Sequence, residues 1–203
     1  MARACLPPRG RISCKACEEA ERLNRYVGNL LDMTRLEGGG LHFRTDWIDV
    51  RDVLMAAAER VSRRLGRRCI ERDFPPELSL ARLDPNLLEQ AVVNILENAI
   101  AYSPDDTAIE LSAYEDRSNV VISVEDEGKG IPTAELERVF EKFRRMEEPT
   151  DRSKGVGLGL SISKGFIEAM GGRIAAASPI HGDHGTRVLI SLPKASPATE
   201  APQ

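Results

Sequence analysis

Apolar residues recur at three- and four-residue steps in several stretches of this chain, and each stretch predicts an amphipathic helix. The first helix is predicted from residue 18 to the triple glycine at 38–40. Its apolar stripe consists of Leu23, Tyr26, Val27, Leu30, Leu31 and Leu36. A helix with such a stripe must bury it, either on the rest of the chain or on a partner.

Three more helices are predicted downstream. Asp49 is a plausible N-cap for the first of them, and Asp84 followed by Pro85 starts the second. The third is predicted over 157–170, where Gly171 and Gly172 end it. The inner face of the helix after Asp49 consists of Val53, Leu54, Ala57, Val61 and Leu65.

Shorter runs rich in β-branched residues predict strands between these helices. The predicted strands cover residues 47–50, 69–74, 78–83, 108–114, 120–124, 173–177 and 186–192. The pattern predicts an α/β fold, a two-layer sandwich in which a mixed sheet carries helices on one face. Residues 1–17 and 195–203 lack periodicity and are expected to be a disordered lead-in and a flexible tail.

Composition excludes several classes of partner. A net charge of −4 gives no global reason to expect nucleic acid or an anionic membrane. No apolar run approaches the roughly 20 residues that span a bilayer, and the N-terminus lacks the apolar core of a signal peptide. We therefore expect a cytoplasmic protein with no nucleic-acid partner and no direct membrane contact.

The cysteines offer a weak metal signal. Cys14 and Cys17 have the CxxC spacing of zinc and redox sites, but no second pair or nearby histidine completes a tetrahedral set. Reduced, unpaired thiols are the simpler interpretation.

Four short motifs carry the main functional signal. They are NILENA at 94–99, DEGKGI at 126–131, FEKF at 140–143 and GVGLGL at 155–160. In this order and spacing they resemble the N, G1, F and G2 boxes of the ATP-binding domain of sensor histidine kinases, within the wider GHKL ATPase group. The resemblance covers residues 18–193 and implies the Bergerat-type ATP-binding fold.

Within that family, residues 29–37 and 46–48 look most like the KdpD-type potassium and turgor sensors. The resemblance implies that 18–40 is a partial dimerisation helix with its linker, through which a dimer is possible. It implies that 41–194 is the ATP-binding catalytic domain.

Asn94 and Asn98 are four residues apart, so both amides project from one helix face. They could be ordinary solvated or capping asparagines, but an unpaired amide inside so apolar a helix costs about 1–3 kcal/mol. Amide oxygens are good Mg²⁺ ligands. The resemblance implies that these residues hold the Mg²⁺ that bridges the triphosphate of ATP, with Asn98 as the metal ligand and Asn94 supporting it.

A second group of residues is assigned to the adenine base. A carboxylate at a strand end can accept a hydrogen bond from an adenine amino group, and glycines let the backbone pass close to a flat base. By itself the segment could be only a turn. The resemblance implies that Asp126 contacts adenine beside Gly128 and Gly130, that the Tyr102 ring packs on the base, and that Thr186 lies near it.

The glycine-rich segment is predicted to bind phosphate. The first amides of a helix have no partners within the helix, which creates an anion site. By resemblance, the nucleotide-binding residues here are Gly155, Gly157, Leu158 and Gly159.

Residues 144–154 are rich in charges of both signs and are expected to form a lid over the phosphates. Arg145, Arg152 and Lys154 are candidates to neutralise phosphate charge, with Lys154 assigned a catalytic role, although each could be a solvated surface charge. Phe140 and Phe143 are expected to anchor the near end of the lid in the core.

The chain departs from the family pattern at two points. The family's acceptor histidine should lie on a helix before residue 18, yet the histidines here are His42, His181 and His184, outside any predicted helix. Self-phosphorylation of the usual kind is therefore not expected. Ala101 stands where the family usually has a basic residue that helps with phosphate.

Hydrolytic members of the GHKL group carry a glutamate where this chain has Asn94. Glu97 is adjacent but points about 60° away from the face of Asn94, because three residues fall short of a full helical turn. Simple ATP hydrolysis is thus disfavoured, whereas phosphoryl transfer depends mainly on positioning and charge neutralisation.

Three interpretations follow. The chain could be a kinase module that phosphorylates a histidine on a separate acceptor protein, and through it a response regulator indirectly. It could be a non-catalytic ATP-binding regulator that pairs with a full-length sensor kinase, or a remnant with no task of its own. Retention of all four motifs favours the first two.

Overall fold

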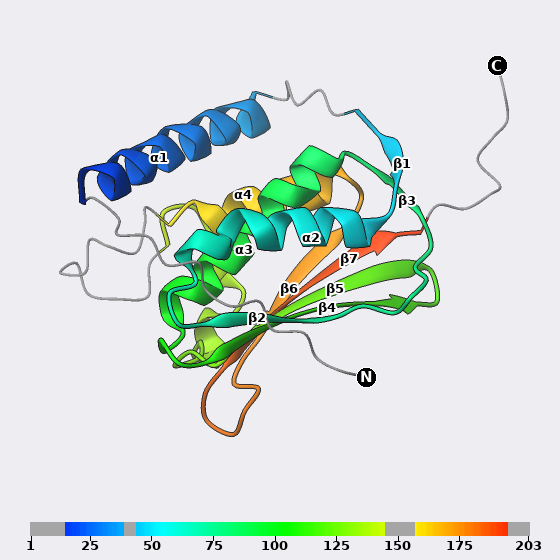
Figure 1. Ribbon diagram of the computed structural model, residues 1–203. Coiled ribbons are helices and arrows are strands. Elements are labelled where there is room, and N and C mark those ends of the chain that lie inside the picture. The colour runs from blue at the N-terminus through cyan, green and yellow to red at the C-terminus, as the bar shows by residue number, and fades with distance from the viewer. Residues whose placement is uncertain (1–14, 39–43, 145–156, 195–203) are drawn as a thin grey trace, which may run out of the picture.

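The computed structural model describes residues 15–38, 44–144 and 157–194 (Figure 1). The longer helices are α1 (Lys15–Glu37), α2 (Val50–Val61), α3 (Pro85–Tyr102) and α4 (Gly159–Ala169), and the short 3₁₀ turns are η1 (Ser62–Arg64), η2 (Thr133–Glu135) and η3 (Arg138–Phe140). The strands are β1 (Asp46–Ile48), β2 (Cys69–Asp73), β3 (Ala81–Leu83), β4 (Ala108–Asp116), β5 (Asn119–Asp126), β6 (Arg173–Ala177) and β7 (Thr186–Pro193).

Five strands form one mixed sheet in the order β2-β4-β5-β7-β6. β2 runs parallel to β4, and the other neighbours are antiparallel. α2, α3 and α4 lie together on one face of this sheet (Figure 1). The predicted two-layer α/β sandwich is confirmed.

The strands predicted at 69–74 and 78–83 belong to different sheets. β2 is an edge of the large sheet, whereas β3 pairs with β1 in a separate antiparallel pair. Short strands of this kind carry no signal for their partner, because pairing depends on contacts distant in sequence.

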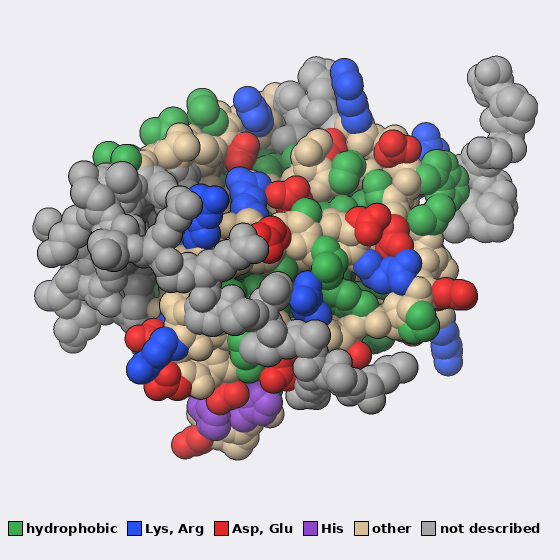
Figure 2. Space-filling view, viewed as in Figure 1, with side chains coloured by type: hydrophobic (Ala, Val, Ile, Leu, Met, Phe, Trp, Pro, Cys, Tyr) green, Lys and Arg blue, Asp and Glu red, His purple; other side chains and the backbone are tan. Residues whose placement is uncertain are grey.

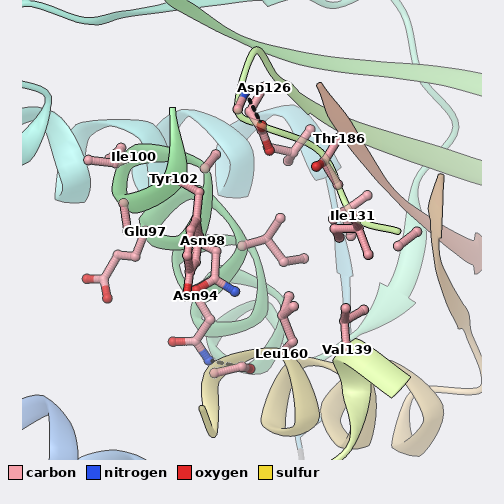
Figure 3. Close-up of a pocket in the computed structure, with 18 of the residues that line it drawn as sticks. Asn94, Glu97, Asn98, Ile100, Tyr102, Asp126, Ile131, Val139, Leu160 and Thr186 are labelled. Carbon is pink, nitrogen blue, oxygen red and sulfur yellow. Dashed lines mark hydrogen bonds between the residues drawn. The ribbon is translucent and has the colours of Figure 1, made fainter. Parts of the chain in front are cut away.

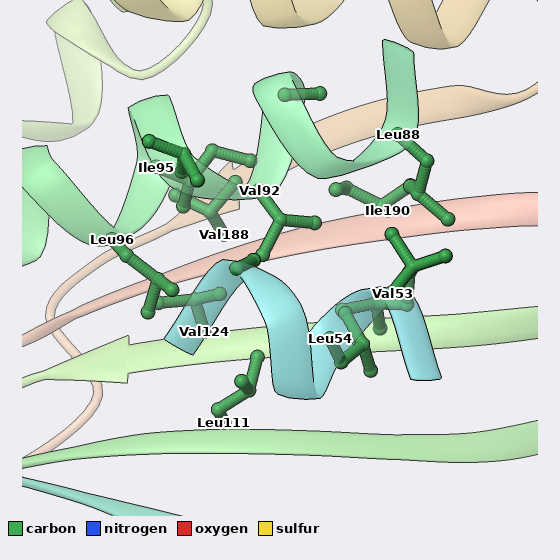
Figure 4. Packing of buried hydrophobic residues seen from close by; sticks show 14 of the residues in the cluster. Val53, Leu54, Leu88, Val92, Ile95, Leu96, Leu111, Val124, Val188 and Ile190 are labelled. Atoms are coloured by element: carbon green, nitrogen blue, oxygen red, sulfur yellow. The ribbon is translucent and has the colours of Figure 1, made fainter. Parts of the chain in front are cut away.

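The core lies between the helical layer and the sheet. Strand side chains alternate between faces, so every second residue of β4 points towards the helices. Figure 4 shows the packed layer, which includes Val53, Leu54, Leu88, Val92, Ile95, Leu96, Leu111, Val124, Val188 and Ile190, all buried. This layer fixes the position of α3, which carries the asparagine pair.

Two predicted carboxylate caps are confirmed. Asp49 accepts a hydrogen bond from the Arg51 amide at 2.9 Å and caps α2. Asp84 accepts from the Asn86 amide at 2.9 Å and caps α3, and its second oxygen accepts from the Arg44 amide. These caps satisfy amide groups that a helix start otherwise leaves unpaired.

α1 begins at Lys15, three residues before its predicted start, and packs on α4. Met33 is buried, and a Cβ atom at Gly165 of α4 would lie 2.7 Å from the Leu36 Cδ1 atom. Glu37 also accepts a hydrogen bond from the Lys142 ammonium at 2.6 Å. Among the described residues, no helix is both long and apolar enough to cross a membrane.

The predicted apolar stripe of α1 is split between two environments. The exposed stripe consists of Leu23, Val27, Leu30 and Leu31, each more than half exposed. Apolar side chains are visible along the outer edge of this helix in Figure 2. One side of α1 thus docks on α4 while the neighbouring side faces solvent.

Candidate functional site

A cavity of about 320 Å³ opens between α3, the end of β5, the start of β7 and the start of α4 (Figure 3). This volume lies within the range of about 300–1,000 Å³ that is usual for small-molecule sites. The motif residues of its wall that the sequence analysis assigned to a ligand are Asn94, Asn98, Tyr102, Asp126, Gly128, Gly130, Gly157, Leu158, Gly159 and Thr186. Four separate segments of the chain therefore converge on one cavity.

Asn94 and Asn98 lie on the cavity side of α3, one turn apart. The buried Asn94 amide donates to the Gly159 carbonyl at 3.4 Å and accepts from the Gln90 amide at 3.3 Å, so it links α3 to the start of α4. Asn98 is half-buried, and its amide has no hydrogen-bond partner within the described part of the chain (Figure 3). Its oxygen is therefore available to a ligand.

Asp126 ends β5 at the edge of the cavity, where it pairs in register with Thr186 of β7. Its carboxylate accepts a hydrogen bond from the Gly128 amide at 2.7 Å (Figure 3). Burial raises the pKa of this carboxyl to about 6, and the amide hydrogen bonds from Gly128 and Thr186 and the nearby His181 limit the rise. Asp126 can thus change its charge near neutral pH.

Gly128 lies where the loop after β5 meets the end of α3. A Cβ atom there would lie 2.7 Å from an Asp126 carboxylate oxygen and 2.9 Å from the Tyr102 carbonyl oxygen. Real Cβ atoms do not approach a backbone oxygen so closely, so only glycine lets this loop close against Tyr102.

The start of the helix in the glycine-rich segment differs from its prediction. α4 begins at Gly159 rather than at residue 157, because Gly157 has a φ of 76°, which is incompatible with a right-handed helix. Leu158 is the N-cap, its side chain is buried, and no side-chain cap hydrogen bond forms at this helix start within the described residues. The first amides of α4 therefore remain open to an anion.

Several expectations fall outside the described residues. They concern Gly155 of the phosphate-binding segment, the lid residues Arg145, Arg152 and Lys154, the linker residue His42, and Cys14 of the CxxC pair.

The anchoring of the lid is correct for Phe140 and wrong for Phe143. Phe140 is buried, but Phe143 is 63% exposed with a φ of 60°. A Cβ atom at Gly157 would lie 2.6 Å from the Arg144 carbonyl, so it is the backbone that packs at this point. Arg144 is fixed separately, by an ion pair with Glu135. The left-handed backbone turns the Phe143 side chain outward, and periodicity carries no signal for such a turn.

Sequence reasoning missed wall residues from distant elements: Tyr26 and Asn29 of α1, and Arg64 of η1. The local sequence does not indicate that α1 lies beside the cavity. Arg64 forms an ion pair with Glu97, which supports the inference that Glu97 is not a general base for water. Ala101 also lines the wall and brings no charge.

The two described histidines are exposed in the loop between β6 and β7, as expected. The ring centroids of His181 and His184 lie 5.8 Å apart, at the tip seen along the lower edge in Figure 2. Within the described ranges, no cluster of three or more His, Cys, Asp or Glu side chains could hold a metal ion.

Comparisons with known proteins agree with this geometry. Residues 83–196 match the sequence profile of the family described as histidine kinase-, DNA gyrase B-, and HSP90-like ATPase. The sensor protein KdpD of Clostridium acetobutylicum is 34% identical over 178 residues, which cover 87% of this chain and 20% of that protein. The chain thus spans about a fifth of the length of the KdpD relatives that it matches.

Solved structures give the same picture. A mycobacterial sensor histidine kinase, MprB, superposes with a TM-score of 0.66 at 30% identity, covering 74% of this chain and 98% of that one. Full-length ShkA in complex with AMPPNP shares the fold, with a TM-score of 0.76 at 23% identity over 92% of this chain and 40% of that one.

Proposed function

The chain belongs to the histidine kinase-, DNA gyrase B-, and HSP90-like ATPase family, and from this membership we propose that it is the ATP-binding catalytic module of a two-component sensor histidine kinase. The observation that carries the proposal is the convergence on one cavity of residues from three of the four motifs, at 94–98, 126–130 and 157–159, together with Thr186. Phosphoryl transfer needs a site that positions a nucleotide and neutralises its charge, and these segments supply the parts.

In this proposal the cavity binds ATP with its base against β5 and its phosphates against α4. Asp126 accepts from the adenine amino group, while Tyr102 packs on the base and Thr186 lies beside it. The buried position of Asp126 supports this role, since a carboxylate shielded from water makes a stronger hydrogen bond. Adenine has an amino donor where guanine has a carbonyl acceptor, so the carboxylate selects for adenine.

The triphosphate is assigned to the amides at the start of α4, with Lys154 as a further charge beyond the described residues. The half-buried Asn98 amide fits a single protein ligand to Mg²⁺, whose other ligands are phosphate oxygens and water. Asn94 supports it from one turn away. The ion neutralises phosphate charge when bound.

The reaction is a transfer of the γ-phosphoryl group to a histidine nitrogen. The bond from the γ-phosphorus to the bridging oxygen breaks, a phosphorus–nitrogen bond forms, the imidazole loses a proton, and ADP leaves. Because the described histidines, His181 and His184, are exposed in a loop and not on a helix, we propose that the acceptor histidine lies on a separate protein, from which the phosphoryl group reaches a response regulator.

The test is to mix this chain and labelled MgATP with a separate acceptor hairpin from a KdpD-type kinase, then measure acid-labile, base-stable phosphate. We expect label on the hairpin with the wild type, and a loss of at least 10-fold with Asn98→Ala. Asn86→Ala is the matched control, because Asn86 is an exposed asparagine at the other end of α3.

One observation favours a second candidate, a regulator that pairs with a full-length sensor kinase. The exposed stripe of α1 leaves four apolar side chains for a partner helix, either from such a kinase or from a second copy. Tight ATP binding without any label on the hairpin would select this candidate.

A further inference from the structure

Arg68 is a largely buried arginine between η1 and β2, outside all four motifs. Only 12% of its side chain is exposed. Its Nη2 atom donates to the Ser103 carbonyl at 2.6 Å and lies 2.8 Å from an Asp105 carboxylate oxygen. Its Nη1 atom is 3.5 Å from the Leu65 carbonyl. The guanidinium therefore connects the turn before β2 to the end of α3.

Arg68 supplies the positive charge near the C-terminal end of α3. The last carbonyls of a helix lack partners within the helix, and the end carries a partial negative charge that cations stabilise. The last turn of α3 contains no basic residue. Ser103 is the C-cap, its amide bonds to the Ala99 carbonyl, and its own carbonyl is held by Arg68. A distant part of the chain thus supplies the missing cation.

The end of α3 in turn supports the loop after β5. Tyr102 directly precedes Ser103, and its carbonyl oxygen is the backbone atom that leaves no room for a Cβ at Gly128. The Gly128 amide donates to the Asp126 carboxylate at 2.7 Å. A shift of the α3 terminus would therefore move both the Tyr102 ring and the partner of Asp126.

We propose that Arg68 is a positioning residue for base recognition, which acts through the Ser103 carbonyl to hold Tyr102 and the Asp126–Gly128 hydrogen bond in register. The inference rests on the proposed ATP site. Arg68 touches neither the nucleotide nor the reacting atoms. Its effect should fall on the choice of base rather than on the phosphates, which bind at α4 and Asn98.

If Arg68 only stabilised the fold, its loss would lower the melting temperature without changing base selectivity. The buried Arg68 Nε atom has no partner within the described residues, so part of the guanidinium is desolvated without compensation. The contribution of Arg68 to global stability is correspondingly reduced, while its local contact with the helix end remains. Loss of Arg68 should therefore alter base selectivity more than the melting temperature.

The first measurement compares the dissociation constants of MgATP and MgGTP for the wild type and Arg68→Ala, at a temperature where circular dichroism shows both folded. We expect ATP binding to weaken about 10-fold and the preference for ATP over GTP to shrink by a similar factor. Arg67→Ala is the matched control, because Arg67 is a neighbouring arginine, 73% exposed, paired only at the surface with Asp106. It should leave both constants unchanged.

The second measurement is hydrogen exchange without nucleotide, which does not depend on the ATP assignment. We expect faster exchange at residues 99–105 and 126–130 together in Arg68→Ala, and no change there in Arg67→Ala. If Arg68→Ala does not fold, Arg68→Gln is read in the same way, since its amide keeps N–H donors but carries no charge.

Unchanged selectivity and unchanged exchange at 126–130, with only a lowered melting temperature, would overturn the positioning role. A wild type that fails to bind ATP would instead remove the proposed function. The exchange coupling between the end of α3 and the β5 loop would then still decide whether Arg68 positions that loop.

Discussion

Asp126 shows how a single buried carboxyl links folding to ligand binding. Its pKa of about 6 lies above the ordinary value of 3.8, so the folded chain holds the proton more tightly than the unfolded chain does. The contribution of protonated Asp126 to the free energy of unfolding is fully present below about pH 4 and is lost as the pH rises through about 6. The proposed role requires the opposite state, because only the ionised carboxylate accepts strongly from adenine.

This opposition predicts a pH profile for ATP affinity. ATP binding should weaken as the pH falls below about 6, where Asp126 takes up its proton. Asp126→Asn should bind ATP about 10-fold more weakly at pH 8, since it loses a charge-assisted hydrogen bond. Its affinity should also show no inflection near pH 6, as titration calorimetry between pH 5 and 8 can establish.

His181 is the necessary control, because its charge acts on the Asp126 carboxyl. His181→Gln should keep the inflection. If it abolishes the inflection while Asp126→Asn preserves it, the histidine is the titrating group and the assignment to Asp126 is wrong.

At the scale of elements, α1 packs on α4 through a small set of side chains. Its docking depends on Met33, on the contact of Leu36 with Gly165, and on the ion pair between Glu37 and Lys142. The exposed ion pair contributes at most about 1 kcal/mol. Burial of the Met33 and Leu36 side chains therefore supplies most of the docking free energy.

We expect Gly165→Leu to release α1 from α4, because the new side chain would occupy the space of the Leu36 methyl groups. Amides of residues 26–37 should exchange at least 10-fold faster, while those of the sheet keep their protection. Gly28→Ala is the control, since nothing lies within 4 Å of the Cβ it would add. Unchanged exchange in Gly165→Leu would show that the docking does not depend on this contact.

The sequence predicts best those features of the fold that depend on residues close together along the chain. The caps at Asp49 and Asp84 and the start of α3 depend on neighbouring residues, and they were predicted correctly. The start of α4 and the exposed Phe143 depend on left-handed backbone at single residues, which hydrophobic periodicity does not report.

The candidate site shows the same division. Asn94, Asn98, Asp126 and Thr186 were assigned to one site because their motifs resemble a family, and the structure brings them to one cavity. Tyr26 and Asn29 were missed, because their place in the wall follows from the docking of α1. Arg68 was missed because its role depends on the end of a helix 35 residues away.

At the scale of the whole molecule, the cavity exists only in the folded chain. Its wall draws on α1, η1, α3, β5, α4 and β7, which span residues 26 to 188. A ligand that binds this wall has no comparable site in the unfolded chain. Binding must therefore stabilise the fold by mass action.

MgATP at 100 times its dissociation constant should raise the free energy of unfolding by about 2.7 kcal/mol. For a chain of this size that corresponds to roughly 5–10 °C in melting temperature. Scanning calorimetry with ATP, in the presence and absence of EDTA, separates the contribution of the ion. Asn98→Ala should lose the EDTA-sensitive part, and a shift that ignores both EDTA and this substitution would contradict the assignment of Asn98 to Mg²⁺.

The two sides of α1 take part in equilibria that depend differently on protein concentration. Docking on α4 joins parts of one polypeptide, so its equilibrium does not change with dilution. Any pairing through the exposed stripe of Leu23, Val27, Leu30 and Leu31 is bimolecular and grows with concentration. Because the sides are distinct, a second molecule can associate without displacing the docked helix, so self-association and helix release are separable events within one 23-residue segment.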